Sequence, residues 1–240
     1  SNNEFRNCRH SVSGGGVVTV RGVSILNNRS FAGGLSTNDF DCHEPCFDWV
    51  FDGNTITQGN SSLGGMVIRG KNIRVINNTF NGGNGALFQT FIADTNGQTG
   101  LIAGGNSFIT CNYAIKLDTT SSAISQVRIT DNYLESSDFG AVVLDDATDV
   151  VVSSNTINGT RDGSGTSGNG IDTRGGSNIV IDSNVMKSII SDAVYSVGTS
   201  NMVISNNSVE TAEHGFNVDN GSNISITGNH IKSNSSLTSA

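Results

Sequence analysis

The sequence contains little proline and few charged residues. Pro45 is the only proline among 240 residues, and charged residues make up 14% of the chain. No run of roughly 18 apolar residues occurs, so we expect no insertion into a membrane. The net charge of -8 argues against a nucleic-acid partner, because nucleic acids bind to basic surfaces. Disorder is excluded as well, because valine and isoleucine recur throughout in short alternating runs.

Cysteine is too sparse for the dense disulfide framework of a small secreted protein. Two cysteines flank His43 and Glu44, which raises the possibility of a metal site. However, two sulfurs and one imidazole lack the paired ligand spacing of a zinc finger or zinc ribbon. We therefore expect buried, reduced thiols, no metal and no other cofactor. The four cysteines are Cys8, Cys42, Cys46 and Cys111.

The most informative feature is a short repeat that occurs along the whole chain. Each copy has an alternating apolar pair, two small or polar residues, an asparagine, one further residue and an apolar residue, as in IRVINNTF and IVIDSNVM. Successive asparagines of this repeat are 22 to 29 residues apart. They are Asn3, Asn28, Asn54, Asn78, Asn106, Asn132, Asn155, Asn184, Asn207 and Asn229.

The repeat predicts an all-β solenoid, because its apolar residues alternate with the period of a strand. A leucine-rich repeat would need a leucine signature that is missing, and a propeller blade would need about 40 residues. A unit of about 25 residues with three short strands fits one coil of a right-handed parallel β-helix. We expect about nine coils in one domain over residues 1–240. Because the repeat reaches both ends, we also expect this domain to be a piece of a longer chain.

The repeated asparagines have a structural explanation. Asparagine tolerates the left-handed backbone conformation that a tight bend requires. Stacked at the spacing of neighbouring strands, about 4.8 Å, its side-chain amides can form a ladder of hydrogen bonds. We therefore interpret these residues as part of the fold and not as ligands of a substrate.

A second repeated strand follows each asparagine and alternates between the two faces of its sheet, so its outward positions form two columns. In the irregular coil over residues 84–105 we expect Phe88 and Thr90 to belong to these columns. We expect Asn217 and Asp219 to be solvated and without a partner. The first column is Asp41, Val67, Lys116, Val143, Asp172, Tyr195 and Asn217. The second column is His43, Arg69, Asp118, Asp145, Arg174, Val197 and Asp219.

The segment over residues 38–49 contains the densest group of side chains that could take part in catalysis. Asp41 and His43 project from one face of a strand, about 6.5 to 7 Å apart, and the next coil should place Arg69 beside His43. Removal of the proton next to a sugar carboxylate needs a base and a group that neutralises the carboxylate. His43 can be the base, and Arg69 can bind the carboxylate through two hydrogen bonds. Asp41 or Glu44 could orient the imidazole, and Lys71 could add positive charge.

This segment also resembles a known family. The residues FDCHE (40–44), followed by a coil that carries GMVIR (65–69), are similar to the D-P-H-D motif and the arginine of periplasmic mannuronan C5-epimerases. The resemblance implies catalytic roles for Asp41, His43 and Arg69. Glu44 replaces the usual aspartate, and Cys42 replaces the proline of the motif. The match covers about two coils.

A rival site consists of acids on later coils, namely Asp118, Asp145 and Asp172. Glycosidases hold two carboxyl groups about 5 to 9.5 Å apart, a separation that neighbouring coils can provide. Lys116 and Arg174 interleave with these acids and could instead form surface ion pairs. Together with Tyr195, the set suits a glycan-binding groove.

Three functions fit these features. The composition, rich in glycine, asparagine and serine, resembles the β-helical body of bacteriophage tailspikes, which implies a homotrimer in the virion tail that depolymerises bacterial surface polysaccharide. The first hypothesis is a lyase that uses the residues around His43, and the second is an endoglycosidase that uses an aspartate pair. The third is a rod that binds glycan without catalysis. A secreted or periplasmic bacterial protein is the alternative to a virion protein.

Overall fold

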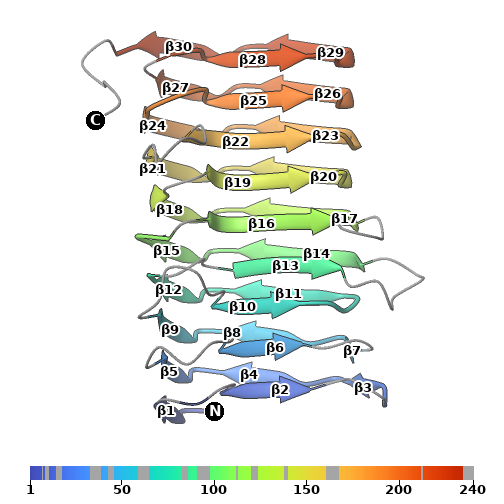
Figure 1. Cartoon of the computed structure of the whole chain (residues 1–240), viewed down its shortest axis with the longest axis vertical. Helices are drawn as coiled ribbons and strands as arrows, with labels where there is room; N and C mark the ends of the chain where they lie inside the picture. The colour runs from blue at the N-terminus through green and yellow to red at the C-terminus, as the bar shows by residue number, and fades with distance from the viewer. Residues whose placement is uncertain are drawn as a thin grey trace.

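A computed structural model provides the coordinates of the chain. The structure describes residues 1–240 except 7, 9–10, 15–17, 33–38, 43–45, 59–64, 83–85, 91–97, 112, 120–123, 138–139, 161–167, 212 and 235–240. All regular structure in the described ranges is β-strand, and the strands stack as a regular series of coils along one axis (Figure 1). Among the described residues there is no helix of the length and hydrophobicity needed to cross a membrane.

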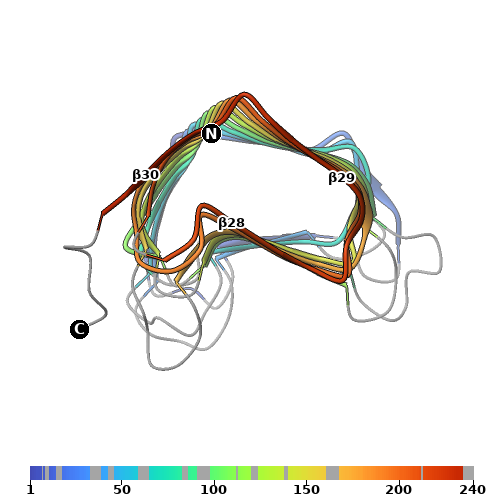
Figure 2. The same ribbon diagram turned by 90° about the horizontal axis from the view of Figure 1, so that it is seen from above.

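Three long parallel sheets, here named A, B and C, form the walls of the rod. Seen from above, the coils superimpose into a flattened tube (Figure 2). Sheet A contains β1 (Glu4–Arg6), β5 (Arg29–Ala32), β9 (Thr55–Gln58), β12 (Thr79–Asn81), β15 (Ser107–Ile109), β18 (Tyr133–Ser137), β21 (Thr156–Thr160), β24 (Val185–Ile189), β27 (Ser208–Thr211) and β30 (His230–Ser233).

Sheets B and C contain nine strands each. Sheet B contains β2 (Val12–Gly14), β6 (Phe40–Cys42), β10 (Met66–Ile68), β13 (Ala86–Thr90), β16 (Tyr113–Thr119), β19 (Gly140–Asp145), β22 (Asn169–Arg174), β25 (Val194–Val197) and β28 (Phe216–Asp219). Sheet C contains β4 (Ser24–Leu26), β8 (Val50–Asp52), β11 (Ile73–Ile76), β14 (Gln98–Gly104), β17 (Ile124–Thr130), β20 (Thr148–Ser153), β23 (Ser177–Asp182), β26 (Ser200–Ser205) and β29 (Ser222–Thr227). A short pair joins β3 (Val20–Arg21) to β7 (Cys46–Phe47).

The core is a continuous apolar interior, because alternate residues of every strand point into the tube. Equivalent residues stack one strand spacing apart. Phe80 and Phe108, for example, are paired in register on β12 and β15, with parallel rings whose centroids are 4.7 Å apart. Trp49 is buried as well, and its ring nitrogen donates a hydrogen bond to the Val20 carbonyl at 3.2 Å. The predicted right-handed parallel β-helix is therefore confirmed.

The asparagine ladder is confirmed, and it is continuous from Asn3 to Asn229. At each step the backbone N–H and the side-chain Nδ2 of one asparagine both donate to Oδ1 of the next. Asn132 accepts both bonds from Asn106, at 3.0 and 2.9 Å, and donates both to Asn155. Its Nδ2 also donates to the Ala103 carbonyl at 2.9 Å. These bonds satisfy polar groups that would otherwise be buried without partners.

The conformation expected of the ladder residues was wrong by one position. In every coil the residue immediately before the ladder asparagine has the positive φ, for example 54° at Asn77 and 58° at Asp131. Glycine takes this place at Gly53, Gly105 and Gly228. The preceding residue makes the bend, and this leaves the asparagine side chain directed into the wall of the rod.

The two outward columns of sheet B were placed correctly over most of their length. The register pairs Asp41 with Val67, and it continues in steps of one strand through Lys116, Val143, Asp172, Tyr195 and Asn217. The irregular coil is an exception. Leu87 and Gln89 occupy the column positions, and the expected Phe88 and Thr90 are one residue out of phase.

The expectation of reduced thiols was wrong for two cysteines. Cys42 and Cys46 form a disulfide, with Cα atoms 6.2 Å apart. Cys8 and Cys111 are free. Burial raises the pKa of the Cys111 thiol to about 12, and this effect outweighs the smaller, opposite effect of backbone hydrogen bonds at Ile109 and Gly82. The thiolate form of Cys111 is therefore strongly disfavoured near neutral pH.

The ladder predicts a large stability loss for Asn132→Ala. This change leaves two buried donors of Asn106 without their acceptor, and we expect the free energy of unfolding to fall by about 2–4 kcal/mol. Urea denaturation monitored by far-ultraviolet circular dichroism measures the change. The matched control is Asn158→Ala, because within the described part of the chain the Asn158 side chain makes only a long 3.5 Å contact with the Tyr133 hydroxyl. Equal losses in the two variants would contradict a stabilising role of the ladder.

The cysteine assignments predict a stepwise thiol titration. In the native protein a thiol reagent should modify Cys8 and leave Cys111 unmodified, since Cys111 is buried and its thiol pKa is raised. Denaturation should expose a second thiol, and reduction should then release two more from Cys42 and Cys46. Mass spectrometry after alkylation distinguishes the four positions. Four reactive thiols without reduction would disprove the disulfide.

Candidate functional site

The outer face of sheet B carries those members of the two columns that the structure describes. The first column has several side chains that are buried although they point outward, among them Asp41, Val67 and Asp172. Polar and charged outward residues occupy successive coils from Lys116 on β16 to Asn217 on β28. Burial of these charges requires partners, because an unpaired buried charge is costly. Two groups of partners are found on this face.

The first group brings Asp41 and Arg69 together. Arg69 Nη1 lies 3.5 Å from Asp41 Oδ1, and the side chains are 11% and 2% exposed. The backbone N–H of Arg69 donates to the Cys42 carbonyl at 3.1 Å, which places Arg69 just beyond the paired ends of β6 and β10. Lys71 follows in an isolated bridge with Phe47, at the corner that leads away from sheet B. His43 and Glu44 lie outside the described residues, so the place of His43 beside Arg69 and the orienting role of Glu44 stay predictions.

The second group consists of two ion pairs formed along single strands. Lys116 Nζ lies 2.8 Å from Asp118 Oδ2 on β16. On β22, Arg174 donates two hydrogen bonds to Asp172, at 2.9 and 3.2 Å. The Asp172 side chain is 3% exposed and that of Arg174 is 55% exposed, so the guanidinium shields the carboxylate from solvent. Asp172 thus belongs to the first column and is held by Arg174.

Asp145 lies between these two ion pairs. It is paired in register with Arg174, and the neighbouring coil brings Asp118 and Lys116 near it. Burial raises the pKa of Asp145 above its usual value, and the nearby Asp118 charge raises it further. The charges of Arg174 and Lys116 act in the opposite direction. The hydrogen bonds that Arg174 donates to Asp172 raise the pKa of the guanidinium.

An open depression in the surface lies over this second group. The depression lies at the ends of β19, β22 and β25. It brings carboxylates, a guanidinium and an aromatic ring within reach of one ligand. The residues that line it are Asp145, Asp146, Arg174, Gly175, Tyr195 and Val197.

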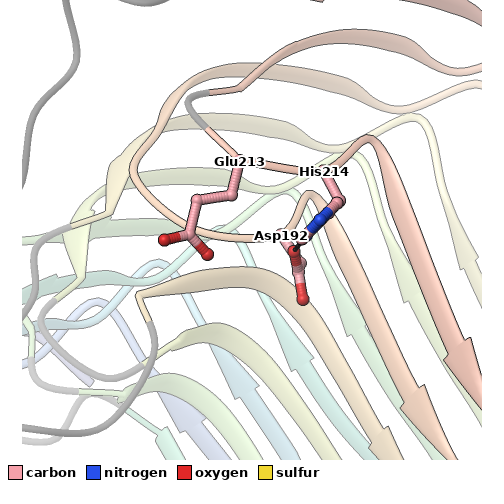
Figure 3. Close-up of side chains that lie close together, drawn as sticks. All are labelled: Asp192, Glu213 and His214. Atoms are coloured by element: carbon pink, nitrogen blue, oxygen red, sulfur yellow. Dashed lines mark hydrogen bonds and ion pairs between the residues drawn. The ribbon is translucent and has the colours of Figure 1, made fainter.

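A third group was missed by the sequence analysis. Asp192, Glu213 and His214 lie in the turns that lead into β25 and β28, where Figure 3 shows the imidazole directed at the Asp192 carboxylate. His214 Nδ1 is 2.8 Å from Asp192 Oδ1. Asn217 donates to Asp192 Oδ2 at 3.0 Å, so the expectation that Asn217 lacks a partner was wrong. A sequence clue existed, because Asp192 and His214 each lie two residues before the apolar residue that begins the next strand of sheet B, Val194 or Phe216.

The charges around Asp145 predict opposite effects of two substitutions on its pKa. Arg174→Ala removes a positive charge and should raise the Asp145 pKa further, whereas Asp118→Asn should lower it. Carboxyl chemical shifts followed through a pH titration measure both shifts. Arg128→Ala, on the outer face of sheet C, is the control and should leave the Asp145 pKa unchanged. A lower Asp145 pKa in Arg174→Ala would contradict the described arrangement.

Comparisons with known proteins agree with this architecture. A family model described as "Right handed beta helix region" matches residues 122–239. No curated protein sequence matches the chain. The crystal structure of the periplasmic alginate epimerase AlgG is similar over 87% of this chain and 50% of that chain, with 14% identity and a TM-score of 0.65. The enzymatically active domain of tailspike protein 2 of bacteriophage CBA120 is similar over 97% and 39%, with 10% identity and a TM-score of 0.56.

At these identities the likeness is one of fold. The chain spans half the length of the epimerase structure and less than half that of the tailspike domain. The parallel sheets, the asparagine ladder and the family match together identify the chain as a right-handed parallel β-helix.

Proposed function

We propose that the chain acts on a bacterial polysaccharide that binds along the outer face of sheet B. The observation that carries this proposal is the row of charged, polar and aromatic side chains on consecutive coils, from Lys116 to Tyr195. Each coil repeats its functional groups at the strand spacing of about 4.8 Å, so an extended ligand can contact several coils at once. A linear chain of sugars has this extended shape and many hydroxyl groups for such contacts.

The structural neighbours support this choice of ligand. One of them is named for alginate, and the other is the enzymatically active part of a tailspike. Their fold matches this chain at TM-scores of 0.65 and 0.56. The fold alone does not assign chemistry, so the proposed reaction is based on the side chains.

The reaction that we propose is proton abstraction at the first group. Arg69 would bind the carboxylate of an acidic sugar and stabilise the negative charge that develops there. His43 would remove the proton next to that carboxylate, and Asp41 or Glu44 would orient the imidazole. The electron pair of the broken C–H bond then forms a C=C bond as the glycosidic C–O bond breaks. The leaving oxygen accepts a proton from water, the protonated His43 returns its proton to solvent, and the product carries an unsaturated sugar end.

The contact between Arg69 and Asp41 is compatible with this role. Its 3.5 Å distance is longer than the 2.7–2.9 Å of a tight charge-assisted hydrogen bond. The Asp41 carboxylate is buried beside the guanidinium and can hold it in place on this face of the rod. Lys71 would add positive charge at the corner of the same coil.

A hydrolase is the second candidate, and the raised pKa of Asp145 favours it. An aspartic acid that holds its proton at higher pH than usual suits a general acid. Asp118 would be the partner carboxylate on the neighbouring coil. The strand spacing of about 4.8 Å is close to the 5–5.5 Å that retaining glycosidases use. Asp172 is less suited, because both of its oxygens accept hydrogen bonds from Arg174.

The assembly and location that we propose are those of a tailspike, a homotrimer in the virion tail, with a secreted or periplasmic bacterial protein as the alternative. The Cys42–Cys46 disulfide supports an oxidising compartment, which is common to both. The third candidate function, a rod that binds glycan without cleaving it, shares the same binding face.

A panel of acidic and neutral bacterial polysaccharides tests these proposals. We expect cleavage of an acidic polymer with a rise in absorbance near 235 nm, the signature of the unsaturated product. His43→Ala should lower the rate at least a hundredfold, because general-base catalysis contributes about 10²- to 10⁴-fold. Arg69→Lys keeps a positive charge beside Asp41 but loses the forked geometry, so it should be impaired while remaining folded.

His230→Ala is the control for the lyase and should retain activity, since His230 is exposed on β30 and lies outside the binding face. The enzyme is a hydrolase and not a lyase if the polymers are shortened with new reducing ends and without a change in absorbance. That activity should then be lost in Asp145→Asn and kept in His43→Ala. If the protein binds a polymer and the length of that polymer on a sizing column is unchanged, the result supports the non-catalytic rod. Absence of both binding and cleavage across the panel would reject all three.

A further inference from the structure

The group formed by Asp192, Glu213 and His214 has no part in the reaction proposed above. One carboxylate oxygen from each acid and one ring nitrogen of the histidine lie within 4.8 Å of one another. The side chains come from two consecutive coils, and Figure 3 shows them at the turn that leads into sheet B. Imidazole and carboxylate groups gathered in this way are ligands for transition metals.

The fold places this group through its backbone register. Gly170 donates its N–H to the Asp192 carbonyl, and Ala193 donates to the His214 carbonyl, both at 3.0 Å. Asn169, Asp192 and His214 therefore occupy the same place in three successive coils. Their separation is set by the strand spacing and does not depend on the conformation of a free loop.

Both carboxylates are oriented by neutral hydrogen-bond donors. Asn217 Nδ2 donates to Asp192 Oδ2 at 3.0 Å, and Ser191 Oγ donates to Glu213 Oε2 at 3.1 Å. The backbone N–H of Asp192 is itself bound by Asn169 Oδ1 at 3.3 Å. Carboxylates that bind metals are commonly held by a second layer of donors in this manner.

The charge balance also favours a cation. The Asp192 side chain is 6% exposed, and its only ion-pair partner among the described residues is His214. Within the same part of the chain, no lysine or arginine forms an ion pair with Asp192 or Glu213. Two carboxylates at this separation repel each other, and a divalent ion would cancel both charges.

We propose that Asp192, Glu213 and His214 bind a divalent transition-metal ion, with Zn²⁺ as the reference ligand. A metal bond to one ring nitrogen moves the imidazole proton to the other nitrogen or to water, so His214 binds as a neutral ligand. Zn²⁺ bonds of about 2.0–2.2 Å require ligand atoms roughly 3.3 Å apart, so the exposed Glu213 side chain must move inward. The side chain of His214 is 65% exposed, so an ion bound there would remain accessible to solvent.

Isothermal titration of the metal-stripped full chain with ZnCl₂ tests the site. We expect saturable binding of a single Zn²⁺ per chain, and weaker binding of CaCl₂, because Ca²⁺ prefers an all-oxygen set of ligands. His214→Ala and Asp192→Asn should each weaken Zn²⁺ binding at least tenfold, and Glu213→Gln should weaken it as well. Thermal denaturation of each variant without metal shows whether it is folded. If Asp192→Asn does not fold, His214→Ala still tests the site, because it alters an exposed side chain.

The matched control is His230→Ala, since His230 is exposed on the last coil and lies outside the group. This variant should bind Zn²⁺ like the unaltered chain. Absence of saturable Zn²⁺ binding, equal losses in His214→Ala and His230→Ala, or tighter binding of Ca²⁺ than Zn²⁺ would each overturn the proposal. The readout is metal affinity, so the result is independent of whether the chain cleaves any polysaccharide.

Discussion

The asparagine ladder is the interaction on which the other features of this molecule depend. Each rung joins one coil to the next through both a backbone N–H and a side-chain amide, and so it fixes the register between coils. Once one residue of a coil is in register, the rest of that strand has a defined neighbour above and below. The stacked aromatic core and the charged face of sheet B are both consequences of that single alignment.

The parts of the structure that repeat were predictable from sequence, and the parts that break the repeat were not. Counting from the ladder asparagines placed Asp41, Lys116 and Tyr195 in one column, because equal intervals imply equal places in the coil. Where a coil is longer, counting alone does not say which strand absorbs the extra residues, and so Phe88 was expected where Leu87 lies. The left-handed bend was misassigned because asparagine tolerates that conformation and is also suited to the ladder.

The candidate sites show the same contrast. The repeat predicted which strand a residue lies on, and it did not predict the contacts between side chains. Asp172 and Arg174 could be placed on one strand from sequence, yet the two-bond contact between them depends on side-chain geometry. The Asp192–His214 pair was missed for a different reason. Its members lie in the turns before β25 and β28, outside the alternating strand pattern that placed the columns, and they meet because consecutive coils stack.

The disulfide between Cys42 and Cys46 has a consequence for the chemistry of this rod. It closes a very short loop, so it removes little entropy from the unfolded chain and adds little to global stability. Its effect is local, because it ties the end of β6 to the start of β7. This corner of the rod is therefore sensitive to redox conditions, because a reducing medium opens the bond between the two cysteines and leaves the asparagine ladder intact.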